Sequence, residues 1–124
     1  MEIRGIMRSP AVSVRPDDTV GKVLEIMNRE KVNGTPIVGE DNKLLGIIVK
    51  ADIYRFLMEP GHFESCPVEW VMTKKVVKAQ AREDVFEVGK RLRNKNVIAL
   101  PVLDGGELVG LVSIEDIVDY FLSR

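Results

Sequence analysis

The sequence predicts a mixed α/β (α+β) fold built from two copies of one β-α-β-β-α unit, and three observations lead to this prediction. Residues recur along the chain at a fixed offset, turn-forming residues separate pairs of short apolar runs, and apolar residues with helical spacing flank each pair. A length of 124 residues allows one compact domain or two small halves that share a core. About 60 residues alone bury too little surface to be comfortably stable.

The internal repeat is a single duplication with a one-residue slip. Residues of the first half recur 65 positions later, so that Met7, Val12, Val20, Val23, Val32 and Pro36 match Met72, Val77, Val85, Val88, Val97 and Pro101. After the slip the offset is 64, and Leu44, Gly46, Asp52 and Ile53 match Leu108, Gly110, Asp116 and Ile117. The slip falls in a predicted turn, because hairpin loops tolerate changes of length.

The two copies are expected to occupy residues 1–60 and 71–124, with a linker over 61–70. Pro60 and Gly61 are expected to stop the last helix of the first copy. Each copy leaves one apolar sheet face uncovered, and the two faces are expected to bury each other about a pseudo-twofold axis. A cleft is expected where the two copies meet.

A β-hairpin is predicted in the middle of each copy. Turn-forming residues at 39–43 and 104–107 separate two short apolar strands, which are expected to pair antiparallel. The first strand of each pair ends at Ile37–Val38 or Val102–Leu103, and the returning strand spans Leu44–Val49 or Leu108–Ser113.

An amphipathic helix is predicted before each hairpin. Apolar positions follow the spacing i, i+3, i+4 and i+7 from Val20 and from Val85. Asp18 or Thr19 is the candidate N-cap of the first helix, and Asp84 is that of the second.

The remaining elements complete the order of each copy. Second helices are expected over 52–58 and 116–122, and short strands are expected before the first helices, over 12–14 and 76–77. We expect two prolines to begin strands, where no ladder N–H is needed, and two glycines to allow close backbone packing within the sheet. These residues are Pro36 and Pro101, and Gly46 and Gly110.

Composition and charge exclude several classes of protein. Lys and Arg number 18 against 19 Asp and Glu, a net charge of −1, so the basic footprint of a general nucleic-acid binder is missing. The lone Cys66 forms no internal disulfide, and the N-terminal residues lack the apolar core of a signal peptide. No apolar stretch approaches the ~20 residues of a membrane span. We expect a cytoplasmic protein with no membrane span.

Three groups of residues occur in the same order in both copies. They are Ile6–Met7 and Val71–Thr73, then Thr35–Val38 and Leu100–Leu103, then Leu44–Ile48 and Leu108–Val112, which lead to Asp52 and Asp116. With this ordered set, the chain resembles a tandem pair of CBS (cystathionine β-synthase type) domains, also called a Bateman module. The resemblance covers the chain from about Ile6 to Leu122, and the double occurrence makes it specific.

The resemblance implies a regulatory module that binds an adenosine derivative, such as AMP, ADP, ATP or S-adenosylmethionine, in the clefts between the two repeats. In the family, an aspartate holds the ribose hydroxyls and a Ser or Thr hydroxyl three residues earlier holds the phosphate. The second repeat matches this pattern with Ser113 and Asp116. The first has Val49 before Asp52, so its hydroxyl is absent, although Lys50 supplies a positive charge.

Elementary chemistry agrees with such a role for Asp116. An ionised carboxylate accepts two charge-assisted hydrogen bonds from a vicinal diol. Because Ser113 ends a strand and Asp116 begins a helix, free backbone N–H groups and the positive end of the helix dipole are expected beside them, and both favour a phosphate.

The resemblance also implies that each site is completed by the opposite repeat. The Asp116 site is then completed by Val12, Val32, Asn33 and Gly34. The Asp52 site is completed by Thr73, Val77, Val97, Ile98 and Ala99, with Lys74, Lys75 and Lys78 nearby in sequence. We expect the stronger site at Asp116, because it alone has the hydroxyl.

Plainer interpretations stay open for these residues. Asp52, Asp116 and Ser113 are each well placed to cap a helix, a role that needs no ligand. The lysines around Val76 suit a solvated surface, and Trp70 suits a packing anchor for the linker. His62 and Cys66 alone do not make a zinc site, and we expect no metal and no cofactor.

Two other functions compete with the sensor. A structural dimerisation module without ligand binding is the alternative, with Val49 as the first sign of a lost site. An enzyme is disfavoured, because one histidine, one cysteine and no base paired with a serine leave no catalytic set. The resemblance implies a homodimer through the helix faces around Phe56, Leu57, Phe121 and Leu122, and a regulated enzyme or transporter as a possible partner.

Overall fold

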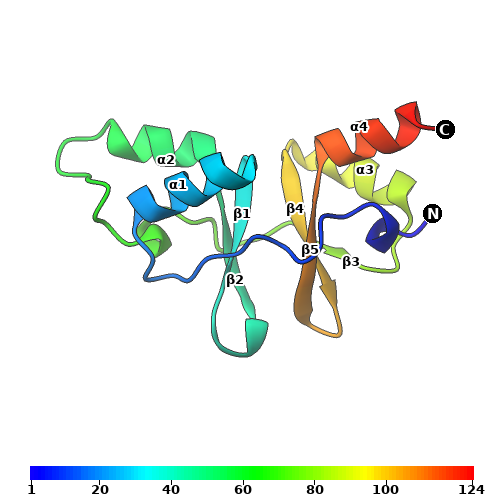
Figure 1. The fold of residues 1–124 in the computed structure, drawn as a ribbon, viewed down its shortest axis with the longest axis horizontal. Coiled ribbons are helices and arrows are strands. Elements are labelled where there is room, and N and C mark those ends of the chain that lie inside the picture. Colours follow the sequence, from blue (N-terminus) through cyan, green and yellow to red (C-terminus); the bar gives the residue numbers. More distant parts are fainter. The chain divides into compact units, whose positions relative to one another are not determined.

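The computed structural model describes all residues, Met1–Arg124, and has the predicted mixed α+β architecture (Figure 1). Four α-helices and five β-strands form two compact units. One unit is a continuous stretch, Val12–Val76, whereas the other combines Met1–Ala11 with Val77–Arg124. None of the helices is long and apolar enough to span a membrane.

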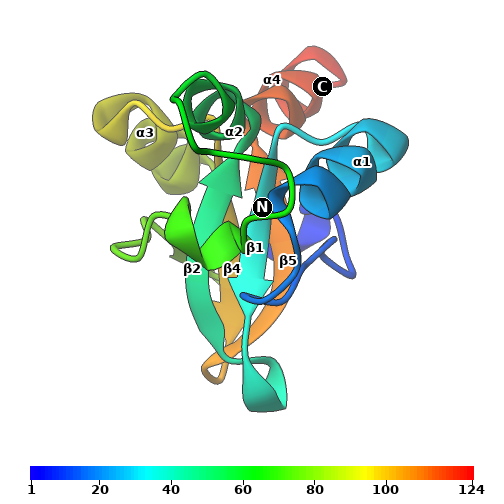
Figure 2. The same ribbon diagram turned by 90° about the vertical axis from the view of Figure 1, so that its left-hand side faces the viewer.

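The Val12–Val76 unit packs two helices on a hairpin. Its elements are α1 (Val20–Glu30), β1 (Gly34–Val38), β2 (Leu44–Val49) and α2 (Lys50–Leu57), with 3-10 turns at Glu40–Asn42 and Val68–Trp70. Strands β1 and β2 pair antiparallel, as predicted. In both views the two helices lie at one end of the hairpin and its turn lies at the other (Figures 1 and 2). The core contains Val20, Val23, Met27, Ile37, Ile48, Ile53 and Val68.

The second unit has a three-stranded sheet in the order β3-β4-β5. Its elements are a 3-10 turn at Ile3–Gly5, β3 (Ala79–Gln80), α3 (Val85–Lys95), β4 (Ala99–Asp104), β5 (Glu107–Ser113) and α4 (Ile114–Leu122). Strand β3 runs parallel to β4, and β4 and β5 form the predicted antiparallel hairpin. The core contains Ile3, Val85, Val88, Leu92, Leu100, Val102, Val112 and Ile117.

The first helix of each unit begins where the sequence predicts. The Thr19 hydroxyl accepts a hydrogen bond from the Lys22 amide, and the Asp84 carboxylate accepts one from the Phe86 amide. Both helices then end on a residue with positive φ, Lys31 at 58° and Asn96 at 54°. The left-handed residue allows the chain to turn back toward the sheet.

Other predicted boundaries are wrong by a few residues. The second helices begin at Lys50 and Ile114, so Asp52 and Asp116 lie inside the first turn and not at the N-cap. The strand expected at 12–14 is reduced to one bridge, from Val14 to Ile37. The strand expected at 76–77 occurs at 79–80, because only there does the backbone run beside β4.

The two prolines lie inside strands, which corrects the expectation that they begin them. Pro36 is the third residue of β1 and faces Ile47, and Pro101 is the third residue of β4 and faces Leu111. Ile47 and Leu111, the residues opposite the prolines, turn their N–H and C=O groups away from the hairpin. Ile47 exchanges two backbone hydrogen bonds with Thr73, and Leu111 exchanges two with Arg8. These are ladder positions at which no proline N–H is required, which explains how a strand interior accepts the residue.

Each unit is completed by a segment that is remote in sequence from its hairpin, called here its borrowed segment. In the second unit Ile3 is fully buried, its N–H donates to Glu83 O at 2.7 Å, and Arg8 exchanges two backbone hydrogen bonds with Leu111. In the first unit the linker residue Val68 is fully buried, and Val20 N–H donates to Cys66 O at 2.8 Å. The segment expected to be a simple linker is therefore part of a core.

Close approach of these segments explains the two strand glycines. A Cβ at Gly46 would lie 2.8 Å from Thr73 O, and a Cβ at Gly110 would lie 2.9 Å from Arg8 O. The side chains of Met72 and Met7 occupy the remaining space over the same two glycines. The expected close backbone packing occurs, but its partners are the borrowed segments and not the strands of the hairpin.

Acidic residues at matching positions brace the turn before the first helix of each unit. Glu83 accepts the Gln80 N–H at 2.7 Å and pairs with Arg91, whose Nη1 lies 2.9 Å from Glu83 Oε2. The hydrogen bond from Arg91 chiefly lowers the pKa of Glu83, against the opposing effect of burial. At Asp18 burial is the largest single effect and raises the pKa, but bonds from the Arg15 amide and the Lys22 ammonium together lower it.

We expect Gly110→Ala to lower the free energy of unfolding by about 1–3 kcal/mol, because the new methyl group meets Met7 and the Arg8 carbonyl. Urea denaturation measures the change. Gly89→Ala in α3 is the matched control: its added Cβ would have a 3.2 Å neighbour, the Ile117 methyl, and alanine favours the helix by about 1 kcal/mol. Equal losses in the two variants would contradict the packing argument.

Glu83→Gln is expected to flatten the acid limb of the stability profile. Since the pKa of Glu83 is lowered in the folded state, its contribution is complete above the unfolded-state pKa and is lost as the pH falls through the folded-state pKa. At pH 7 the free energy of unfolding of the variant should be about 1–2 kcal/mol lower than that of the wild type. Between pH 7 and pH 3 the variant should lose less stability than the wild type does. Exposed Glu87→Gln is the control, and parallel profiles for wild type and Glu83→Gln would refute the assignment.

Candidate functional site

The end of β5 and the first turn of α4 hold Ser113 and Asp116 in a reciprocal cap. Ser113 Oγ accepts the Asp116 N–H at 3.1 Å, and Asp116 Oδ2 accepts the Ser113 N–H at 2.9 Å. Both side chains are half-buried, and the second carboxylate oxygen, Oδ1, has no partner in the chain. The cap fixes the rotamer of the aspartate and leaves one oxygen available to a ligand.

The backbone around this cap is more fully bonded than the sequence suggests. The Ile114 N–H donates to Ile98 O at 2.9 Å, and the Asp116 N–H is taken by Ser113. The expectation of free N–H groups at this helix end is therefore largely wrong, because the preceding loop and the capping serine satisfy two of them. An anion here has fewer donors than an uncapped helix would offer.

The equivalent position in the other unit is built differently. Val49 occupies the N-cap of α2 and makes no side-chain cap, as expected from its missing hydroxyl. The Asp52 carboxylate is paired with Arg55, one turn along the same helix, so Asp52 does not cap its helix. Lys50 reaches across to α1, where its Nζ lies 2.7 Å from Asn28 Oδ1.

The loop before each hairpin lies beside the aspartate of its own unit. Ala99 faces Ser113 across the β4-β5 ladder, and Gly34 faces Val49 across the β1-β2 ladder. The Lys50 N–H donates to Asn33 O at 2.9 Å, which matches the bond from Ile114 to Ile98. Each loop therefore lies beside the start of the helix that holds the aspartate of its own unit.

The thirteen candidate residues divide between the two units. One unit holds Val12, Val32, Asn33, Gly34, Lys50, Asp52 and Thr73, and the other holds Val77, Val97, Ile98, Ala99, Ser113 and Asp116. Thr73 is bound to Ile47 through both backbone groups, at 2.9 and 2.8 Å. Val77 is partly buried against the core of the second unit. The completion of each site by the opposite repeat stays a prediction.

Sequence reasoning missed Arg55, the residue in direct contact with Asp52. The signal was available, because positions i and i+3 lie on one face of a helix and opposite charges there form pairs. The residue three positions after Asp116 is Asp119, a second carboxylate. The two aspartates therefore have neighbours of opposite charge.

Other residues singled out by the sequence have structural positions. The His62 ring stacks on Phe56 with 4.0 Å between centroids, and its Nδ1 lies 2.9 Å from Phe56 O, so it closes the end of α2. Cys66 is buried, and no group of three potential metal ligands exists. Trp70 is 66% exposed, which contradicts its expected anchoring role; the smaller Val68 fills that place in the core.

The CBS domain model matches residues 3–59 and 68–123. The chain belongs to the CBS domain family. Its two matched segments correspond to the two copies found by the internal repeat. The CBS domain pair of protein MJ0100, in complex with 5′-methylthioadenosine and S-adenosyl-L-methionine, has a similar fold, with a TM-score of 0.90 and 28% identity. The alignment covers 99% of this chain and 97% of that one.

The CBS pair is also similar to parts of longer enzymes. It is 35% identical over 116 residues to inosine-5′-monophosphate dehydrogenase of Aquifex aeolicus, covering 92% of this chain and 23% of that enzyme. It is 27% identical over 118 residues to homoserine O-acetyltransferase of Methanococcus vannielii, covering 94% of this chain and 24% of that enzyme. The chain thus spans about a quarter of the length of these relatives.

Removing or adding a cap hydroxyl is expected to change stability in opposite directions. Ser113→Ala removes the bond to the Asp116 amide and should lower the free energy of unfolding by about 1 kcal/mol. Val49→Thr, which is almost equal in size, adds an acceptor for the Asp52 amide and should raise it by up to about 1 kcal/mol. Urea denaturation of the two variants tests both, and a loss of stability in Val49→Thr would count against the assignment of that N-cap.

Proposed function

We propose that this CBS domain pair is a regulatory sensor that binds an adenosine derivative through Asp52 and Asp116. The observation that carries the proposal is the fixed carboxylate of Asp116, with one oxygen bound in the cap and the other without a partner. A carboxylate held in this way can accept hydrogen bonds from the two hydroxyls of a ribose. Asp52 lies at the matching position of the other unit, where its carboxylate is held by Arg55 and not by a cap.

The proposed ligand class has support from a related structure. The MJ0100 pair, 28% identical and similar over nearly its whole length, was crystallised with two adenosine derivatives. Methylthioadenosine and S-adenosylmethionine share the adenosine group with AMP, ADP and ATP and differ at the 5′ position. We therefore propose adenosine as the common recognised part, with the 5′ group as the variable part.

A regulatory sensor acts on a partner whose activity changes when the ligand binds. A ligand can shift a conformational equilibrium only through unequal affinity for the two states. Because the relatives carry their CBS pair as about a quarter of an enzyme, we propose that ligand binding here controls an enzyme or transporter. A homodimer of this chain is part of the proposal.

Exposed apolar residues on α4 favour a second candidate, a purely structural dimerisation module. Val118 is 48% exposed, Phe121 is 42% exposed and Leu122 is 78% exposed. The matching face of α2 is similar, since Tyr54 is 50% exposed and Met58 is 82% exposed, whereas Leu57 packs against the core. A module of this kind would associate without any response to adenosine compounds.

Thermal-shift and calorimetric titrations separate the two candidates. Under the sensor proposal at least one of AMP, ADP, ATP and S-adenosylmethionine stabilises the protein, by ~2.7 kcal/mol at 100 times its dissociation constant. The double variant Asp52→Ala/Asp116→Ala should abolish the response, and Asp104→Ala at an exposed hairpin turn should retain it. If none of the four compounds stabilises the wild-type protein, the sensor proposal fails and the dimerisation module is the remaining candidate.

A further inference from the structure

The two aspartates lie on equivalent helices whose surrounding charges have opposite sign. In α2 the residues from 50 to 55 include Lys50, Asp52 and Arg55, a formal charge of +1. In α4 the equivalent residues from 114 to 119 include Glu115, Asp116 and Asp119, a formal charge of −3. The environments of the two carboxylates therefore differ by four charges.

From this difference we infer that the two units select adenosine compounds by the charge of the 5′ group. The Asp52 unit takes 5′-phosphorylated adenosine, and the Asp116 unit takes adenosine with an uncharged or cationic 5′ group. This reverses the expectation that the Ser113 hydroxyl marks the phosphate site, since Ser113 Oγ already accepts the Asp116 N–H in the cap. The inference rests on the proposed function and specifies the ligand class at each aspartate.

The cations of α2 are placed to act on a ligand at Asp52. Arg55 contacts the Asp52 carboxylate, so its guanidinium already reaches the oxygen that a ribose would occupy. Its side chain is 70% exposed and can move without breaking a core contact. When the ribose takes over Asp52, the guanidinium is released, and its planar donors match a phosphate.

The carboxylates of α4 have no compensating cation. Glu115 and Asp119 are exposed, and neither forms an ion pair or a side-chain hydrogen bond. Asp119 lies one turn from Asp116 on the same face, where α2 has Arg55. A dianionic phosphate bound beside this helix turn would be repelled by these carboxylates, and added salt would weaken the repulsion. A cationic sulfonium group would be attracted by the same carboxylates.

The neighbouring helices do not remove this contrast. The last turn of α1 has Arg29, Glu30 and Lys31, with Arg29 paired to Glu30, and the last turn of α3 has Arg93 and Lys95. These ends differ by one formal charge, against four for α2 and α4. The sign of the difference is therefore set by the helices that hold the aspartates.

AMP and 5′-methylthioadenosine form a matched pair of probes, because they share adenosine and differ in the charge of the 5′ group. Calorimetry on Asp116→Ala, which keeps the Asp52 site, should show AMP binding at least about tenfold tighter than methylthioadenosine, or ~1.4 kcal/mol. Asp52→Ala, which keeps the Asp116 site, should show the reverse order. The AMP affinity should fall with added salt, and the methylthioadenosine affinity should not.

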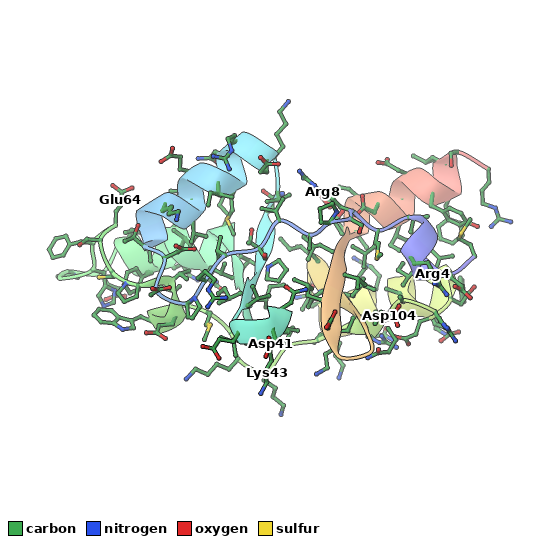
Figure 3. The ribbon with its side chains drawn as sticks, turned by 60° about the horizontal axis from the view of Figure 1, so that its bottom comes forward. Arg4, Arg8, Asp41, Lys43, Glu64 and Asp104 are labelled. Carbon is green, nitrogen blue, oxygen red and sulfur yellow. The ribbon has the colours of Figure 1, made fainter.

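Charge exchange at one position tests the cause. In the Asp116→Ala background, Arg55→Asp should remove the preference for AMP, and in the Asp52→Ala background, Asp119→Arg should weaken the preference for methylthioadenosine. The matched controls are Lys43→Asp and Asp104→Lys at the two hairpin turns (Figure 3). They make the same changes in charge at the far end of a strand, roughly 20 Å away, and should leave both preferences unchanged.

The possible outcomes distinguish a failure of adenosine binding from a failure of charge selection. If the wild type binds neither compound and no other adenosine derivative, the proposed function fails. If the wild type binds both compounds and the two single-site variants prefer the same one, only the charge inference is overturned. A hairpin control with as large an effect as Arg55→Asp or Asp119→Arg would also overturn it, since the preference would then follow net charge and not the local helix.

Discussion

The backbone groups of Ile47 and Leu111 that point away from their hairpins must find partners, and this constraint organises both units. A buried strand cannot leave N–H and C=O groups without hydrogen bonds. Thr73 and Arg8 supply the partners from segments remote in sequence. The same arrangement accounts for a proline opposite each of these positions and for a glycine beside it.

Local sequence signals predict the parts of the fold that depend on neighbouring residues. The offset of the repeat, the two hairpin turns and the capped starts of α1 and α3 are all read from residues within one element. Signals of this kind do not show which remote segment completes a sheet. The burial of Ile3 and Val68, and the exposure of Trp70, follow from the borrowed segments and lie outside any local pattern.

The candidate site shows the same division. The sequence places Ser113 and Asp116 correctly at one helix start and identifies the missing hydroxyl at Val49. It does not show that Arg55 binds Asp52, because a side chain with 70% exposure has many rotamers and its partner is chosen by local geometry. The family resemblance suggests an adenosine ligand. The two repeats share the position of the aspartate, but the charges on α2 and α4 give the two aspartates different environments.

The borrowed N-terminal segment has a consequence for synthesis on the ribosome. The Val12–Val76 unit contains all of its own residues by the time Val76 is translated, whereas Ser9 pairs with Val109, 100 residues later. At 5–20 residues per second, the segment that includes Ile3 waits about 5–20 seconds for its binding partner. During nascent-chain growth its apolar side chains are unsheltered, and the earlier unit reaches its final form while the later one is still incomplete.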